Sequence, residues 1–256
     1  MMKKISIIVL LSAVTIITLS YYKHSEYKSV AYSLAIQPKL QSGDLKYRIY
    51  LFGIFPVGEA VFSDQGIKEL NGVRVRHLTA SASSSTIFSS FFSAQALLDS
   101  FLDLQDENPL LFRQRLSVTG KEDSLKEITY DQKQQVMTLE GVRREILPGT
   151  QDPLSAMFRL RGMDFDKSNK IKMNINTNQK NYLLEGTAEE RTLSLVGERC
   201  KLITAKAQIR RRDKNPYHKS MVSFVLFKGG ENVPVLIKVF ASGVMITAKL
   251  SDPYLE

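Results

Sequence analysis

One short helix signal stands in a region that otherwise alternates like β-strands, and this contrast limits the folds open to the chain. Asp152 suits the N-cap position, where its carboxylate can accept from free backbone N–H groups. Pro153 suits the first helical position, because its missing N–H needs no partner there. Leu154, Met157 and Phe158 follow an i, i+3, i+4 spacing and predict one apolar face. A helix with one apolar face needs a sheet to cover.

The end of the helix is marked as well as its start. Arg159 and Arg161 complement the negative C-terminal end of the helix dipole. Gly162 predicts a left-handed residue that stops the helix. The sequence therefore predicts a helix over residues 152–161.

Period-two alternation predicts the sheet. Ile171, Met173 and Ile175 alternate with polar residues, and Asn71-Gly72 predicts a type I′ hairpin turn. About a dozen strands are expected, over residues 45–51, 59–63, 73–82, 97–104, 110–118, 124–130, 135–139, 170–177, 182–186, 200–210, 221–227, 233–240 and 243–250. The predicted fold class is mainly β: a strongly curled antiparallel sheet or open barrel with one short covering helix, after an N-terminal transmembrane or signal segment.

The N-terminal sequence predicts a segment that directs the chain to a membrane. Lys3 and Lys4 precede 18 residues without a charge, residues 5–22, which is long enough to span a bilayer. Two interpretations remain open, an uncleaved signal anchor and a cleaved signal peptide. Either places the rest of the chain in the periplasm. The predicted organisation is a signal segment over 1–22, a tether over 23–42 and a single β-rich domain over 43–256.

Composition and motifs give no catalytic constellation. The one cysteine, Cys200, and the three histidines form no recognisable nucleophile–base or metal-ligand spacing, so we expect no enzyme, no metal and no cofactor. The formal net charge is +9. The aromatic residues are not clustered with the arginines as a base-stacking platform would need, and the chain is expected to be exported, so nucleic acid is not an expected partner.

Two further segments are candidates for binding. Four apolar side chains spaced like a helical turn lie in a serine-rich stretch and are interpreted either as a plug for the core or as an apolar lip beside a ligand cavity: Ile87, Phe88, Phe91 and Phe92. The densest basic cluster is interpreted either as a solvated hairpin end or as a contact for anionic head groups: Arg210, Arg211, Arg212 and Lys214.

Three blocks together resemble a known family. They are the first turn and its flanking strands over residues 43–60, the helix start over 151–156, and the closing hairpin over 233–250. The chain is similar to the bacterial envelope family named domain of unknown function 3108, over about residues 43–250. The resemblance implies an exported β-rich domain without an established activity. Phe52 and Phe55 make the first turn more apolar than the family pattern.

These observations predict a non-enzymatic envelope protein that holds an apolar or amphipathic, lipid-like ligand inside a curled sheet. The alternative is a scaffold or adaptor that binds an envelope protein or an anionic polymer through its outer surface. The inner membrane, through residues 5–22, is the first expected partner.

Overall fold

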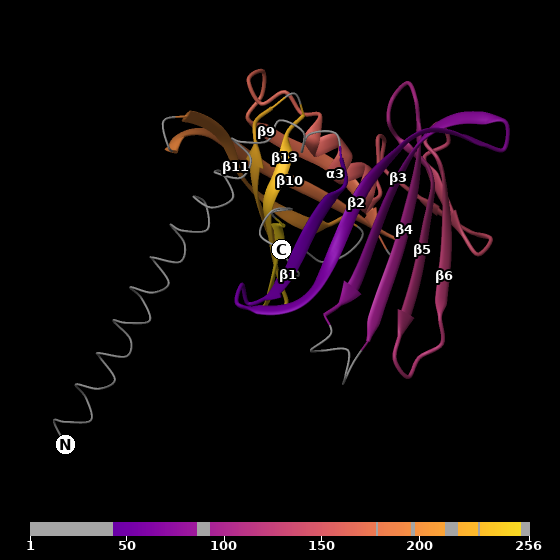
Figure 1. Cartoon of the computed structure of the whole chain (residues 1–256). Helices are drawn as coiled ribbons and strands as arrows, with labels where there is room; N and C mark the ends of the chain where they lie inside the picture. Colours follow the sequence, from indigo (N-terminus) through magenta and orange to yellow (C-terminus); the bar gives the residue numbers. More distant parts are fainter. Residues whose placement is uncertain are drawn as a thin grey trace.

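The computed structural model describes residues 43–85, 93–177, 179–195, 198–212, 220–229 and 231–251. These residues form a 14-stranded antiparallel sheet and one helix, α3 (Pro153–Arg161) (Figure 1). The strands are β1 (Leu45–Leu51), β2 (Phe55–Leu70), β3 (Val73–Ser84), β4 (Ala94–Asp103), β5 (Pro109–Val118), β6 (Ser124–Asp131), β7 (Val136–Leu139), β8 (Val142–Glu145), β9 (Lys170–Thr177), β10 (Lys180–Leu195), β11 (Glu198–Arg211), β12 (Ser220–Phe227), β13 (Val233–Ala241) and β14 (Val244–Leu250).

The first strand, β1, pairs with the last strand, β14, in the middle of the sheet. From this pair, sequential antiparallel strands extend the sheet on both sides. Its order is β8-β7-β6-β5-β4-β3-β2-β1-β14-β13-β12-β11-β10-β9, so β1 pairs with β14 and the two edges are β8 and β9. These edge strands follow one another in the sequence, and α3 lies in the segment between them. The sheet is therefore curled but open, with its only described helix between the two edges.

The segment before the helix partly bridges the opening. The N–H of Gln151 donates to the carbonyl of Asn174 over 2.8 Å, and the N–H of Asn176 donates to the carbonyl of Gln151 over 2.8 Å. Gln151 thus adds one parallel bridge to the edge strand β9. This bridge fixes where the chain enters α3.

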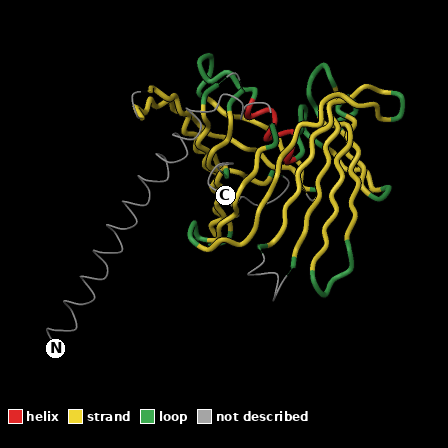
Figure 2. Tube along the Cα trace, in the orientation of Figure 1, coloured by secondary structure: helices red, strands yellow, loops and turns green. Residues whose placement is uncertain are grey.

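The helix lies between the two halves of the sheet (Figure 2). Leu154 and Phe158 belong to one buried cluster with β1 to β7, whereas Leu160 belongs to a second buried cluster with β9 to β12. The predicted helix, its N-cap and its apolar residues are confirmed. However, α3 is buried on more than one side, because it joins two clusters rather than covering one surface.

Three details of the sequence prediction are corrected. Gly162 has φ −81° and ψ −4°, a right-handed conformation, because its N–H donates back to the carbonyls of Phe158 and Leu160 and tightens the last turn. The strand predicted over residues 59–63 is the middle of the 16-residue strand β2, and β8 was not predicted. The turn at Asn71-Gly72 is confirmed, with φ values of +51° and +80°.

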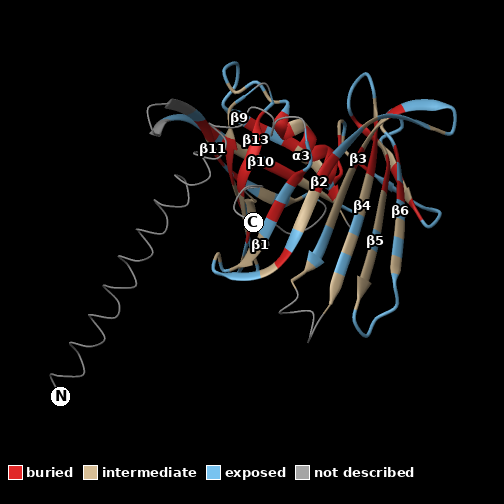
Figure 3. Ribbon diagram, viewed as in Figure 1, coloured by how far each residue is buried: buried red, intermediate tan, exposed pale blue. Residues whose placement is uncertain are grey.

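The two ends of the long strands differ in how far they are buried. Buried residues gather around α3, whereas the opposite ends of β2 to β6 are partly or fully exposed (Figure 3). We call the face that contacts α3 and the two clusters the inner face, and the opposite one the outer face. On the inner face, Ala60, Ala82 and Ala96 form one cross-strand row beyond the helix, and none of the three is buried.

Candidate functional site

At the end of the sheet that contacts α3, the chain's own side chains fill the interior. Asp152 is fully buried, and its Oδ1 accepts from the backbone N–H groups of Leu154 and Ser155 over 2.7 and 3.0 Å. The Ser100 hydroxyl donates to Oδ2 over 2.5 Å, and the Asp152 N–H donates to the Ser155 hydroxyl over 2.8 Å. Both carboxylate oxygens therefore hold the helix start in place.

Burial sets the proton affinity of this group. Desolvation raises the pKa of Asp152, and the hydrogen bonds from Ser100 and the helix N-terminus oppose the rise. Tyr130 lies nearby; desolvation and then the charge of Asp152 raise its pKa, and its buried hydroxyl has no hydrogen-bond partner among the described residues. No solvent reaches Asp152, so this polar centre anchors the helix rather than forming an accessible reaction site.

A wide hollow lies on the outer face, over β10 to β14. Its volume is about 680 Å³, within the range of about 300–1,000 Å³ that small-molecule sites occupy. Two neighbouring cross-strand rows line it. The first row is Glu185, Gln208, Met221, Phe240 and Met245, and the second includes Thr187, Lys206, Ser223 and Lys238.

The two rows differ in chemistry. Met221 is 54% exposed and Phe240 is 43% exposed, although both are large apolar side chains. Lys206 and Lys238 contribute ammonium groups one row further along the strands. The first row is apolar at Met221, Phe240 and Met245 and polar at Glu185 and Gln208. Its apolar part beside the two lysines fits a ligand that has an apolar chain and an anionic head.

Gly186 allows strands β10 and β11 to approach closely at this hollow. A Cβ at Gly186 would lie 2.1 Å from the carbonyl oxygen of Lys206 and 2.6 Å from the Cα of Ala207. Backbone atoms cannot move aside for such a contact, so only glycine permits this approach of β10 to β11. Gly186 lies in the inner-face position between the two rows, where it shapes the floor of the hollow.

Part of the predicted basic cluster lies at the rim. The guanidinium of Arg210 contacts the Glu185 carboxylate over 2.5 Å, with both side chains nearly half exposed. A surface pair of this kind contributes about 0–1 kcal/mol, so an anionic ligand can compete for the arginine. Arg211 ends β11 and Arg212 directly follows it, whereas Lys214 lies outside the described residues.

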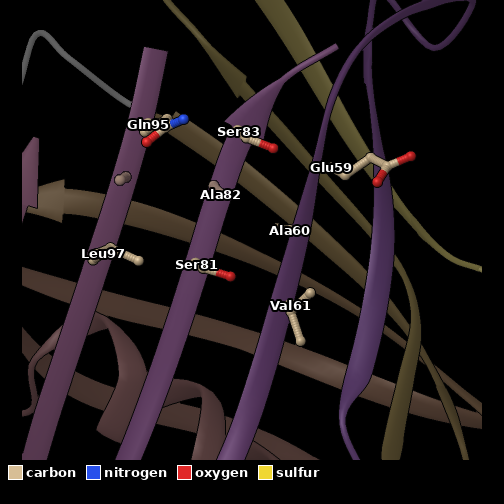
Figure 4. Close-up of a pocket in the computed structure, with 9 residues that line it drawn as sticks. Glu59, Ala60, Val61, Ser81, Ala82, Ser83, Gln95 and Leu97 are labelled. Atoms are coloured by element: carbon tan, nitrogen blue, oxygen red, sulfur yellow. The ribbon is translucent and has the colours of Figure 1, made fainter. Parts of the chain in front are cut away.

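A smaller hollow of about 200 Å³ lies on the outer face of the other half, over β2 to β4. Figure 4 shows its lining, in which Val61, Ser81 and Leu97 form one row and Glu59, Ser83 and Gln95 form the next. Small side chains on the middle strand leave the space.

The one described histidine is a packed surface residue. His77 Nε2 lies 2.8 Å from an Asp99 oxygen, and its ring stacks on Phe101 with centroids 4.4 Å apart. The guanidinium of Arg113 also lies over the Phe101 ring, 5.6 Å from its centroid. Within the described ranges no three His, Cys, Asp or Glu side chains gather closely enough to hold a metal ion.

Several residues singled out from the sequence lie outside the described part of the chain. The predicted lip, Ile87, Phe88, Phe91 and Phe92, lies outside the described residues, as do the predicted membrane segment and tether and the side chain of Cys200. In the part of the chain that is described, no helix is long and apolar enough to cross a membrane.

The sequence reasoning missed the residues of the larger hollow. Alternation alone places Met221 with Ser223, and Lys238 with Phe240, on one face of each strand. It does not tell which positions on different strands lie opposite one another.

An open, barrel-like antiparallel sheet with a helix between its edges defines the class of this protein. The fold is similar to a crystal structure of a β-barrel-like protein of domain of unknown function DUF1849 from Brucella abortus. The TM-score is 0.54 at 12% sequence identity, and the match covers 81% of this chain and 94% of that chain. At this identity the likeness concerns the fold alone.

The model of the family "Protein of unknown function (DUF3108)" matches residues 46–247, so the chain belongs to that family, as its three sequence blocks predicted. Comparison with curated proteins finds no match.

Proposed function

We propose that this protein is a non-catalytic binding protein of the bacterial cell envelope that holds a lipid-like, amphipathic anion. The observation that carries the proposal is the outer-face hollow, which combines exposed apolar side chains with two lysines, Lys206 and Lys238, in the neighbouring row. Apolar contact supplies affinity, and the cations orient the head group.

The proposed position differs from the one predicted from sequence. Around α3, the space inside the curled sheet is filled by Leu154, Phe158 and Leu160. A ligand inside the sheet would have to lie away from the helix. The inner-face alanine row beyond the helix is the remaining internal position. We therefore design the test to separate the inner face from the outer hollow.

The alternative is an adaptor that binds a partner through its outer surface. Exposed apolar side chains on that face favour it. Because Met221 and Phe240 line a hollow rather than a flat patch, a small amphipathic ligand fits them better than a broad protein interface does.

The test is a titration of the full-length chain, held in nanodiscs, with dansyl-labelled undecanoic acid, with empty nanodiscs as the blank. Replacing Met221 and Phe240 by Ser removes two apolar contacts and should weaken binding about tenfold. The matched control is Leu125→Ser, which removes an apolar side chain that is 61% exposed and lies outside the hollow.

Two further variants locate the site. Lys206→Gln should weaken binding of the fatty acid but not of its uncharged methyl ester, whereas Lys68→Gln on β2 should change neither. Ala82→Trp fills the inner-face row and should leave affinity unchanged. If Ala82→Trp alone abolishes binding, the ligand lies inside the sheet; if no variant differs from the blank, the binding function is wrong.

A further inference from the structure

The turn between β1 and β2 presents large apolar side chains to solvent. Phe52 is 48% exposed, Ile54 is 59% exposed and Phe55 is 53% exposed. They follow one another within four residues, and no acidic or basic residue interrupts them between Leu51 and Val57. Exposure of three neighbouring side chains of this size needs a reason outside folding.

Folding does not account for Phe52. Four X-Gly pairs in the described chain have positive φ at both residues, with φ near +50° at the first position and +76° to +80° at the glycine. The first residue is Asn71, Glu140 or Ser242 in three of them and Phe52 in the fourth, where φ is +52°. A bulky side chain is unfavourable in this conformation, whereas asparagine adopts it readily. The phenylalanine therefore costs stability and gains no burial.

The neighbouring turn extends the apolar surface. The N–H of Phe52 donates to the carbonyl of Met245 over 2.7 Å, and Gly53 lies against the Met245 side chain. Val244 and Ile246 on β14 are also exposed. We call the two turns, residues 52–55 and 241–246, the apolar tip; Met245 belongs both to the tip and to the lining of the hollow.

Charge around the tip is mostly basic. The two hairpin regions that carry the tip, residues 45–59 and 233–250, contain Lys46, Arg48, Lys238 and Lys249, and their one acidic residue, Glu59, lies opposite Arg48 in the β1–β2 register. Arg48 is four residues from Phe52, which is about 13 Å along a strand. A tip sunk about 5–10 Å into the interface would hold such cations at the level of the head groups.

We propose that the apolar tip seats in the surface of a bilayer that contains anionic lipid. Neighbouring phenylalanine and isoleucine side chains enter the boundary between head groups and acyl chains, and the cations behind them contact lipid phosphates. Because Met245 links the tip to the hollow, the seated tip places the hollow beside the membrane. The proposal thus deepens the proposed function, on which it rests, and names the surface from which its ligand comes.

The chain contains no tryptophan, which permits a position-specific test. Phe55→Trp places a single fluorophore in the tip, and Val73→Trp places one at the opposite end of β2 and β3, on a side chain of similar exposure. Both full-length variants are reconstituted into vesicles that contain brominated lipids. Since the N-terminal segment is present in both, it cannot by itself produce a difference between the two positions.

We expect brominated lipid to quench the fluorescence of the Phe55→Trp chain strongly and that of the Val73→Trp chain little. Quenching of the Phe55→Trp chain should be greater in phosphatidylglycerol-containing vesicles than in phosphatidylcholine vesicles. Adding Phe52→Asn, which suits the turn conformation, should reduce quenching while the far-UV spectrum is kept and the urea midpoint is unchanged or higher. Lys238→Gln should reduce the preference for anionic vesicles, and Lys68→Gln should not.

Equal quenching at both positions, or none at position 55, would overturn the proposal; the second result is also what a protein-binding tip would give. If the tip is not quenched but the chain still binds the fatty acid, membrane insertion of the tip is rejected and the proposed function stands. If the tip is quenched but the chain does not bind the fatty acid, the proposed function is rejected and membrane insertion of the tip stands.

Discussion

The buried carboxylate at the start of α3 allows the most detailed prediction. Asp152→Ala leaves the N–H groups of Leu154 and Ser155 without their acceptor inside the protein. An unsatisfied buried N–H costs about 1–3 kcal/mol, so the two cost about 2–6 kcal/mol. Relief of the buried charge offsets part of this. We expect a net loss of about 3 kcal/mol, more than the roughly 1 kcal/mol typical of an N-cap.

Asp152→Asn separates the cap from the charge. Its amide oxygen can accept the same two N–H groups, and the Ser100 hydroxyl can rotate to accept from the amide. We expect this variant to stay within about 1 kcal/mol of the parent chain near neutral pH. Asp106→Ala, which removes an exposed carboxylate that accepts from the Asn108 N–H, is the matched control and should cost about 0.5 kcal/mol.

The ionisation of the buried Asp152 carboxyl group predicts how the stability of the folded chain depends on pH. Because the pKa of Asp152 is raised in the folded state, the folded chain binds a proton before the unfolded chain does as pH falls. This group therefore adds stability as pH decreases from its folded pKa towards the unfolded value of about 3.9. The stability of the parent chain relative to Asp152→Asn should rise on acidification across that interval.

Urea unfolding followed by far-UV circular dichroism, at several pH values, measures both effects. The reasoning is refuted if Asp152→Ala unfolds at the same urea concentration as Asp106→Ala. It is also refuted if the difference between the parent chain and Asp152→Asn falls on acidification.

Three other predictions concern the fold and its location. Phe158→Ala should lower the free energy of unfolding by about 3–5 kcal/mol, since the ring is buried in the first cluster; a loss below about 1 kcal/mol would show that α3 is not packed there. Gly186→Val should prevent the close pairing of β10 with β11 and lower the thermal midpoint, whereas Gly43→Val, with nothing within 4 Å, should not; equal midpoints would contradict this close approach. Alkaline phosphatase fused after Glu256 should be active only when exported, and activity in a strain that cannot export it would end the envelope proposal.

Much of the fold follows from local signals. Alternation located most of the strands, and Asp152 with Pro153 located α3, because an N-cap and an N1 proline act within a few residues. The last residue of α3 was predicted, but the conformation of Gly162 was not, because glycine can adopt either hand and hydrogen bonding to Phe158 and Leu160 selected the right-handed one. Glycine marks a permissive position without specifying its conformation.

The candidate site depends on relations that local signals do not contain. Met221 meets Phe240 through the β12–β13 register, and Lys206 meets Ser223 through the β11–β12 register. A bulge between Val225 and Leu226 shifts the first of these registers, and no residue pattern announces it. The hollow is therefore a property of strand pairing, which sequence alternation alone does not fix.

Photo-crosslinking tests the central claim most directly. The full-length chain in membranes is irradiated with a diazirine-labelled fatty acid, and modified residues are identified by mass spectrometry. The account predicts label on the outer-face row at Met221, Phe240 and Met245, lost when unlabelled fatty acid is in excess. Competed label on the inner-face row at Ala82 and Ala96 instead, or no competed label in the described part of the chain, would contradict it.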